Sequence, residues 1–404
     1  MTKKSSTPAI RFKGFTDTWE QRKLGECFSE RVESMPDGEL ISVTINDGIK
    51  KFSELGRHDN SNDNKSKYKK VCVGDIAYNS MRMWQGASGY SPYEGIVSPA
   101  YTVLSPNAGV FSRCIAYQFK LPQMIHTFQI NSQGITSDNW NLKYPTLSEI
   151  EIYISKNVAE QKQIAEFFTS LDNLITLHQR KYDKLTNVKK SMLEKMFPKN
   201  GSNVPEIRFK GFTEAWEQRK LIDYLEVSSL KNKTGVYGKE DVLSVSGDFG
   251  IVNQIEFQGR SFAGASLANY GVVETGDIVY TKSPLKANPY GIIKANKGKA
   301  GIVSTLYAAY KPKENTDSTF VQIYFEQDAR MNNYMQPLVN KGAKNDMKVS
   351  DENALKGRVS FPKKPEQIAI SSYFESLDNL ITLHQRELEK LKNLKKACLE
   401  KMFV

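Results

Sequence analysis

The sequence predicts a mixed helix-and-sheet protein, α/β (α+β): two sheet-containing domains separated by an antiparallel coiled coil of two long helices, with pseudo-twofold symmetry. Two internal repeats predict this symmetry. IRFKGFTDTWEQRKL at 10–24 returns as IRFKGFTEAWEQRKL at 207–221, with thirteen of fifteen positions identical, and SLDNLITLHQR occurs at 170–180 and at 376–386. Such repeats determine the architecture, so they come before any assignment of single elements. The segments between them differ, which indicates one frame used twice with different contents.

The composition favours a folded protein with a polyanionic partner. A chain of 404 residues is long enough for two or three domains. Hydrophobic residues make up 39% and aromatic residues 11%, which is typical of folded rather than disordered proteins. Lys and Arg outnumber Asp and Glu by 56 to 45, a net charge of +11. This excess favours nucleic acid first and an acidic membrane surface second. A basic protein without such a partner is the alternative.

The cysteines and the apolar runs indicate a cytoplasmic protein. The four cysteines are isolated, and no CxxC pair or Cys/His ligand spacing occurs. This argues against a structural zinc and against a disulfide framework, and it suits a reducing compartment. No apolar run reaches 18 residues, and the N-terminal residues lack the apolar stretch of a signal peptide. We therefore expect no membrane partner.

Both halves of the chain have the same predicted order of elements. A short opening segment is followed by a region rich in Gly, Tyr, Ser and Asn with short strand-like runs, and a long charged helix closes the half. These changes in composition predict four parts. The first sheet-containing domain covers 1–155, the first long helix 156–200, the second sheet-containing domain 201–362 and the second long helix 363–404.

The two closing helices have the clearest pattern. Apolar residues recur every three, four or seven positions over about 158–197 and about 365–403, which predicts an apolar stripe on each charged helix. Asn157 followed by Glu160 predicts an N-cap and its reciprocal partner. Pro365 favours the start of the second helix. Helices of this length with one stripe most simply bury their stripes against each other in a coiled coil.

The regions between the repeats share short strand patterns. Gly-Asp-Ile-x-Tyr occurs at 74–78 and at 276–280, each time before a polar loop. The segments 95–106 and 301–312 each read as one strand after a glycine turn. The two regions are therefore expected to share a framework and to differ mainly in their loops.

No catalytic constellation is recognisable. The sequence has no glycine-rich S-adenosylmethionine loop, no GxxxxGK[ST], no HExxH and no GxSxG, and its four histidines are scattered. The tripeptide at 288–290, Asn-Pro-Tyr, is only a partial match to an amino-methylase motif and reads as a turn. The sequence predicts a recognition protein that is not an enzyme, with no cofactor and no metal of its own.

Polar and basic loops at the predicted strand ends are the candidates for DNA contact. Arg and Lys donate to guanine edges or to phosphates, and Asn and Gln pair with adenine. The alternative is an ordinary polar surface loop. The candidate DNA-binding residues are Arg57, Lys65, Lys67, Asn79, Ser80, Arg82, Trp84, Gln85, Thr136, Asn139, Lys282, Ser283, Lys286, Asn288, Lys344 and Asn345.

Several paired motifs point to a known family. The opening segment ends twice in Trp-Glu-Gln-Arg-Lys-Leu, and a Gly-Asp-Ile-x-Tyr strand follows each time. Glu-Gln at 160–161 and at 366–367 leads into helices that end in Leu-Glu-Lys-Met-Phe at 193–197 and 399–403. In this order the chain resembles the specificity subunit of type I restriction–modification systems, over essentially its whole length.

The resemblance implies a function and partners. Each variable region is expected to be a target recognition domain that reads one half of a split sequence in double-stranded DNA, and the helices are expected to be the spacer between them. Two modification (methyltransferase) subunits and the restriction (translocase–nuclease) subunits would dock on this frame. S-adenosylmethionine, Mg²⁺ and ATP would belong to those partners. A standalone sequence-specific DNA-binding regulator is the main alternative. A catalytic nuclease or methylase with an unrecognised site and a structural adaptor remain open as well.

Overall fold

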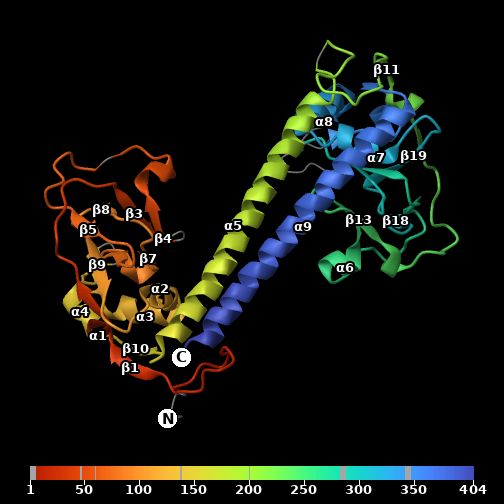
Figure 1. The fold of residues 1–404 in the computed structure, drawn as a ribbon. Helices are drawn as coiled ribbons and strands as arrows, with labels where there is room; N and C mark the ends of the chain where they lie inside the picture. The colour runs from red at the N-terminus through yellow and green to blue at the C-terminus, as the bar shows by residue number, and fades with distance from the viewer. Residues whose placement is uncertain are drawn as a thin grey trace. The chain divides into compact units, whose positions relative to one another are not determined.

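The computed structural model describes residues 6–45, 48–59, 61–136, 139–199, 201–282, 288–341 and 347–404. The chain forms two compact units. Unit 1 comprises Met1–Gln179 with Gln385–Val404, and unit 2 comprises Arg180–His384. Each of the two long helices therefore contributes one half to unit 1 and one half to unit 2 (Figure 1).

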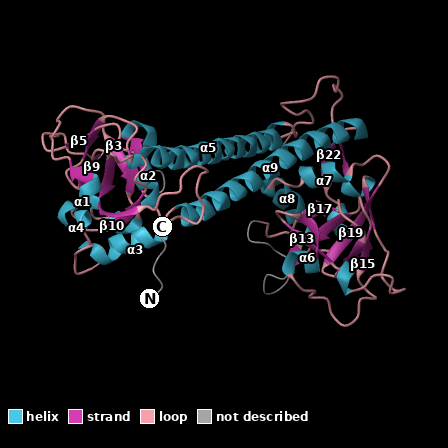
Figure 2. Ribbon diagram, turned by 60° about the horizontal axis from the view of Figure 1, so that its bottom comes forward, coloured by secondary structure: helices cyan, strands magenta, loops and turns pink. Residues whose placement is uncertain are grey.

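Unit 1 is built on a four-stranded antiparallel sheet in the order β2-β9-β6-β7. Three two-stranded pairs, β1 with β10, β3 with β4 and β5 with β8, and several short helices complete it (Figure 2). Its strands are β1 (Glu20–Lys23), β2 (Phe28–Glu30), β3 (Ile41–Thr44), β4 (Gly48–Lys51), β5 (Lys69–Val71), β6 (Ile76–Asn79), β7 (Ser88–Tyr90), β8 (Gly95–Val97), β9 (Tyr101–Pro106) and β10 (Glu151–Ile154), and its short helices are α1 (Leu24–Cys27), η1 (Phe52–Leu55), η2 (Met83–Gln85), α2 (Ser112–Gln118), α3 (Pro122–Asn131) and α4 (Tyr144–Ser148).

The predicted mixed helix-and-sheet class is confirmed by both units. Unit 2 repeats the plan of unit 1 with the sheet order β12-β19-β16-β17. Its strands are β11 (Glu217–Lys220), β12 (Leu225–Val227), β13 (Leu243–Ser246), β14 (Gly250–Asn253), β15 (Gly271–Val273), β16 (Ile278–Thr281), β17 (Ile293–Ala295), β18 (Gly301–Val303), β19 (Tyr307–Pro312), β20 (Asn340–Lys341), β21 (Met347–Lys348) and β22 (Arg358–Phe361), and its short helices are η4 (Leu221–Asp223), η5 (Lys239–Asp241), α6 (Gln254–Gln258), α7 (Ser318–Tyr324), α8 (Asp328–Met335), η6 (Gln336–Leu338) and η8 (Asn353–Leu355).

The Gly-Asp-Ile-x-Tyr motif leads into an inner strand of each sheet, β6 and β16, which confirms that it marks a strand. Gly74 and Gly276 have φ values of 99° and 92°, a conformation that favours glycine because it has no Cβ. Asp75 and Asp277 each accept a hydrogen bond at 2.8 Å from the backbone N–H three residues before them, which closes the turn. The isoleucine and tyrosine that follow are buried in the core. The motif therefore encodes a tight turn followed by a buried strand.

The prediction of one strand over each of 95–106 and 301–312 is wrong, because each segment contains two strands. β8 pairs with β5, and β9 pairs with β2 and β6. A turn separates the two strands, in which the Tyr101 N–H donates to the Ser98 oxygen at 3.0 Å. Pro99 follows Ser98, and its fixed φ suits the second position of a turn. Pro99 indicates the break in 95–106, whereas the equivalent turn in 301–312, in which the Tyr307 N–H donates to the Ser304 oxygen at 3.0 Å, contains no proline.

The long helices are α5 (Val158–Lys195) and α9 (Lys364–Met402), close to the predicted bounds. In unit 1 the start of α5 packs against the end of α9, and in unit 2 the end of α5 packs against the start of α9, so the two halves run antiparallel within each unit (Figure 1). The predicted apolar stripes are therefore part of the core. Shared core residues include Ile164, Phe168, Leu171, Cys398 and Met402 in unit 1, and Leu193, Met196, Ile370, Phe374 and Leu377 in unit 2.

Only half of the predicted capping arrangement of α5 occurs. Asn157 is the N-cap, since its Oδ1 accepts from the Ala159 N–H at 2.9 Å. Glu160 is not its reciprocal partner, because the Asn157 N–H donates to Ser155 Oγ at 3.1 Å. Glu160 instead accepts from Arg11 Nε at 2.5 Å and from Arg11 Nη2 at 2.8 Å. A fully buried carboxylate is better stabilised by a bidentate guanidinium than by one backbone N–H.

The same pair of charges joins the opening segment to the long helix in both units. Arg208 donates to both oxygens of Glu366 at 2.6 and 2.7 Å, as Arg11 does to Glu160. Trp19 adds a hydrogen bond from Nε1 to Glu160 at 3.3 Å. Burial disfavours the charged form of Glu160, but the hydrogen bonds from Arg11, Ser155 and Trp19 and the charge of Arg11 together outweigh it and hold the pKa below its ordinary value. The duplicated opening segment therefore fixes each sheet region to the start of a long helix.

Within the described part of the chain, no helix combines the length and the apolar character that crossing a membrane requires.

Candidate nucleic-acid interface

The loop that follows β6 presents several of the predicted DNA-binding side chains. We call residues 79–86 the reading loop of unit 1. Asn79 Oδ1 accepts from the Met81 N–H at 3.1 Å, and the Arg82 N–H donates to the Asn79 oxygen at 3.0 Å. Arg82 is exposed, and its Nη1 lies 3.3 Å from Gln85 Oε1. The loop therefore presents a guanidinium and an amide side by side, and both groups can donate to base edges.

The reading loop is anchored to the core of unit 1. Met83 is fully buried. Gly86 ends η2 with a φ of 80°, and its oxygen accepts from Lys120 Nζ at 2.6 Å. Ser80, one of the predicted DNA-binding residues, is 8% exposed, and its hydroxyl lies 3.0 Å from Thr102 Oγ1. Its side chain is therefore buried beneath the loop and turned away from solvent. Such anchoring keeps the exposed groups of the loop in a defined geometry.

The segment around Trp140, which contains the predicted residues Thr136 and Asn139, lies against the reading loop. The rings of Trp84 and Trp140 pack edge to face with centroids 5.3 Å apart, and the Leu142 N–H donates to the Ser80 oxygen at 2.9 Å. Trp84 Nε1 is used within its own loop, where it donates to the Met81 oxygen at 3.1 Å. The structure thus brings together two segments that are about 55 residues apart in the sequence. The predicted residues Thr136 and Asn139 of the second segment are both exposed.

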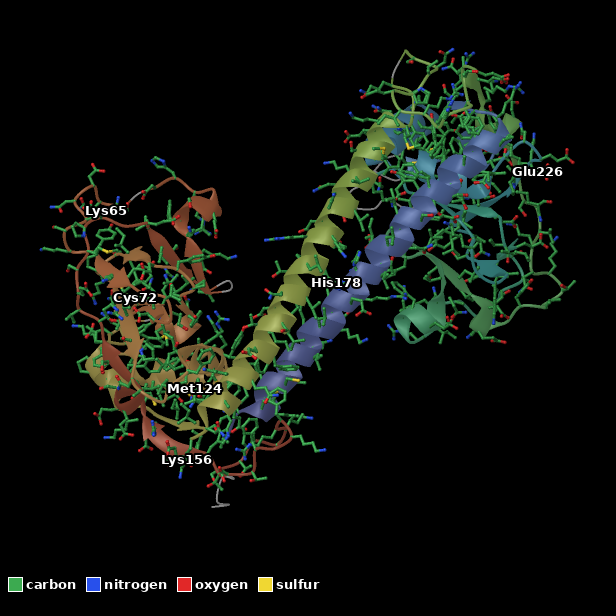
Figure 3. All side chains as sticks on the ribbon, viewed as in Figure 1. Lys65, Cys72, Met124, Lys156, His178 and Glu226 are labelled. Atoms are coloured by element: carbon green, nitrogen blue, oxygen red, sulfur yellow. The ribbon has the colours of Figure 1, made fainter. Side chains whose placement is uncertain are left out.

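The basic residues Arg57, Lys65 and Lys67 lie elsewhere in unit 1, on the connection between η1 and β5 (Figure 3). Arg57 and Lys67 are exposed and Lys65 is partly buried. Lys69, later in the same stretch, pairs with Glu30 at 3.3 Å. The structure therefore keeps these three predicted cations near the surface, where Lys and Arg can meet phosphates.

In unit 2 the described residues cover only part of the matching site. Lys282 follows β16, and its Nζ forms an ion pair with Asp351 Oδ1 at 2.6 Å. Asn288 is partly buried, and its Oδ1 has no hydrogen-bond partner among the described residues. Lys282 and Asp351 join the segment after the central strand to the segment before β22, as the tryptophan pair does in unit 1. The predicted residues Ser283, Lys286, Lys344 and Asn345 lie outside the described residues.

One residue that supports the site was missed by the sequence reasoning. Lys120 follows α2, and its ammonium donates to the oxygens of Gly86 and Ser88 at 2.6 and 2.8 Å and to that of Ile45 at 3.2 Å. Burial, together with the charge of Lys395, lowers the pKa of Lys120 to about 8. Since its partners are 32 to 75 residues away along the chain, no local motif could have indicated this role.

Metal-binding chemistry has no candidate in the described ranges. No group of three or more His, Cys, Asp and Glu side chains in them is placed to hold a metal ion.

Comparison with known proteins points to one family. Residues 16–187 match the family model described as the type I restriction modification DNA specificity domain. Two specificity subunits of Methanocaldococcus jannaschii are similar over most of their length. The MjaX type I restriction enzyme specificity subunit is 24% identical over 87% of this chain and 83% of its own. The MjaVIII subunit is 23% identical over 82% of this chain and 80% of its own.

A solved structure supports the same assignment at the level of the fold. The S subunit of a type I restriction–modification system from M. genitalium superposes with a TM-score of 0.61, at 15% identity, over 98% of this chain and 99% of its own. The relatives are named as specificity subunits, which corresponds to the recognition role without catalysis that the sequence predicted. The family model, the curated relatives and the shared fold together support the assignment of this chain as a type I restriction–modification specificity subunit.

Proposed function

We propose that this chain reads an asymmetric, bipartite target in double-stranded DNA. The domain at 1–155 reads one half of the target and the domain at 201–362 reads the other. The segments 156–200 and 363–404 form the spacer that sets the number of unread base pairs between the half-sites. The net charge of +11 supports a polyanionic partner, and the assignment as a specificity subunit supports DNA as that partner.

One observation carries the proposal: the two units share a strand order but differ in the loop that follows the central strand. β6 and β16 occupy the same place in their sheets. The loop after β6 contains Asn79, Arg82 and Gln85, whereas Lys282 and Asn288 flank the loop after β16. Different donors and acceptors at one structural position select different bases, at about 1–3 kcal/mol for each good bidentate pair. Two unlike half-sites follow.

Partner subunits supply the chemistry in this proposal. Two modification (methyltransferase) subunits and the restriction (translocase–nuclease) subunits dock on the chain, and S-adenosylmethionine, Mg²⁺ and ATP are bound by those subunits in the cytoplasm. The family assignment supports such an assembly. If the purified chain alone cleaved or methylated DNA, this division of labour would be refuted.

The test is to purify the chain with the methyltransferase encoded beside it and to map methylated adenines in host DNA with and without the chain. We expect co-purification and a bipartite methylated motif that disappears when the gene is deleted. If no partner co-purifies and methylation is unchanged while DNA binding persists, the chain is a standalone DNA-binding regulator. Absence of salt-dependent DNA binding would contradict both functions.

A further inference from the structure

Five of the twelve residues that line a cavity in unit 1 are lysines. The cavity has a volume of about 540 Å³ and lies where the end of β4 and the start of α3 face the unit 1 halves of α5 and α9. Asp172 and Glu400 are its acidic lining residues, so five lysines against two carboxylates give the lining a formal charge of +3. We call it the lysine cavity. Its lysines are Lys50, Lys120, Lys392, Lys395 and Lys396.

One of the two carboxylates is already engaged. Asp172 accepts from Lys395 Nζ at 2.5 Å through Oδ1 and from the Tyr117 hydroxyl at 2.8 Å through Oδ2. Lys392 and Lys396 are exposed at the mouth of the cavity, and none of the ion pairs formed by the described residues involves them. The positive charge of the cavity is therefore only partly neutralised within the protein, and the groups best able to donate to a ligand lie at its mouth.

The equivalent place in unit 2 lacks this excess of positive charge. The repeat SLDNLITLHQR places Asp378 where unit 1 has Asp172, and the repeated helix ends at 193–197 and 399–403 place Lys189 where unit 1 has Lys395. Lys189 Nζ pairs with Asp378 at 2.7 Å and also with Glu326 at 2.6 Å. Because Glu326 stands where unit 1 has Lys120, no bound anion is needed to balance the charge of the lysine there. The lysine–aspartate pair between the helices thus belongs to the common frame.

The other positions extend this contrast. Lys396 is matched by Lys190 and Glu400 by Glu194. Lys392 is matched by Thr186, and Lys50, the third residue of β4, by Val252 of β14. Including the pairs above, the seven positions carry two lysines and three carboxylates in unit 2, a formal charge of −1 against +3 in unit 1. The excess of lysines is therefore specific to unit 1 and is not a property of the frame.

We propose that the lysine cavity holds a phosphate group of the DNA backbone beside the half-site that unit 1 reads. This inference rests on the proposed function. Lysine ammonium groups bind phosphates as point charges, and each phosphate they neutralise releases counterions. Lys392 and Lys396 would donate to the phosphate, while Lys50, Lys120 and Lys395 supply positive charge behind it.

The position of Lys120 links this phosphate site to base reading. The same ammonium that lines the cavity donates to the oxygens of Gly86 and Ser88, at the end of the reading loop. Phosphate contacts fix the register of a protein on the duplex, and base contacts then specify the sequence. A phosphate in the cavity therefore places the backbone at a fixed distance from Arg82 and Gln85, and unit 2 has to fix its register by other contacts.

The test compares two double variants of the full-length chain with equal loss of charge. Lys392→Gln/Lys396→Gln removes the exposed lysines of the cavity, and Lys184→Gln/Lys190→Gln removes two exposed lysines from the unit 2 half of α5. Binding to a duplex that carries the mapped motif is measured by fluorescence anisotropy from about 50 to about 200 mM KCl. We expect the salt slope of log K to fall by about 1 in the cavity variant, because one phosphate contact accounts for about 0.9, and by less than half of this in the control.

Equal slopes for the wild type and the cavity variant would overturn the inference while leaving the proposed function intact. Loss of salt-dependent binding in the wild type itself would contradict the proposed function. A second arm replaces chloride with inorganic phosphate at constant ionic strength. Competition with DNA in the wild type but not in the cavity variant supports a backbone phosphate in the cavity. A phosphate-dependent rise of the melting temperature of the wild type, with DNA binding equal in both proteins, would show a free-phosphate site and overturn the inference.

Discussion

Unit 1 and unit 2 share the ion pair between their two long helices. They differ in the charges that their sheet regions place beside this pair. The Lys395–Asp172 and Lys189–Asp378 pairs occupy the same place between the two long helices. Two residues after the equivalent helices α2 and α7, unit 1 has Lys120 and unit 2 has Glu326. The comparison teaches that the duplicated frame maintains packing and orientation, whereas the variable regions decide charge and recognition.

The opening segments support the same conclusion. Arg11–Glu160 and Arg208–Glu366 have nearly identical bidentate geometry. The two units nevertheless differ in one detail of the frame. Trp19 donates to Glu160. Its counterpart Trp216 is also buried, but Nε1 of Trp216 has no hydrogen-bond partner among the described residues. Differences within the frame are thus small, and those in the loops are large.

The largest expected effect comes from breaking the buried ion pairs of the frame. Glu160→Gln leaves the Arg11 charge without its partner, and we expect the free energy of unfolding to fall by about 3 kcal/mol. Glu366→Gln should cost slightly less, because Glu366 does not accept a hydrogen bond from a tryptophan. Urea denaturation of both variants measures the difference. A loss of less than about 1 kcal/mol would mean that these pairs contribute no more than surface pairs do.

Acid should remove the contribution of Glu160 selectively. Its pKa is lowered in the folded protein, so the stabilisation is present above the unfolded pKa of about 4.3 and is lost as the pH falls through the folded value. The wild type and Glu160→Gln should therefore converge in stability below about pH 4. A constant difference from neutral pH to pH 3 would contradict this account.

A smaller effect is expected where the two units differ in charge. Lys120→Met removes the donor to three backbone oxygens, and we expect a loss of about 2 kcal/mol with faster amide exchange around Gly86. Glu326→Gln should cost about 1 kcal/mol or less, because Lys189 keeps Asp378 as its partner. Hydrogen exchange and urea denaturation measure both effects. Equal losses in the two variants would refute the view that Lys120 anchors the reading loop.

A separate effect, on the pH dependence of stability, concerns the titration of Lys120. Its pKa is lowered from 10.5 to about 8 by burial and by Lys395. Between these values the unfolded chain binds more protons at this site, so this lysine adds stability as the pH rises. The other charged groups of the cavity, Lys50, Lys392, Lys396, Asp172 and Glu400, are the same in both proteins. The wild type should therefore gain stability relative to Lys120→Met from about pH 8 to about pH 10.5, and a difference that stays flat would contradict the lowered pKa.

The frame could be predicted from the sequence because its signals are local. The apolar spacing of α5 and α9 and the Gly-Asp-Ile-x-Tyr strands are short-range patterns, and the structure confirms them. The predicted reciprocal cap was wrong because the carboxylate of Glu160 binds Arg11, 149 residues earlier. A motif of four residues contains no information about such a distant competitor.

The candidate site was only partly predictable. A polar loop after β6 was expected, and the structure shows Arg82 and Gln85 together on it. The sequence could not show that the hydroxyl of Ser80 is buried against Thr102 or that Trp84 packs on Trp140. These contacts join strands and loops that are distant in the chain. The lysine cavity had no sequence signal for the same reason, since its lining comes from four separate segments of unit 1.

The most direct test of the central claim is to replace residues 25–154 by the corresponding region of a related specificity subunit and to map methylated adenines in host DNA. We predict that one half of the bipartite motif changes while the other half and the gap between them stay the same. A change in both halves would contradict the claim that each unit reads its own half-site.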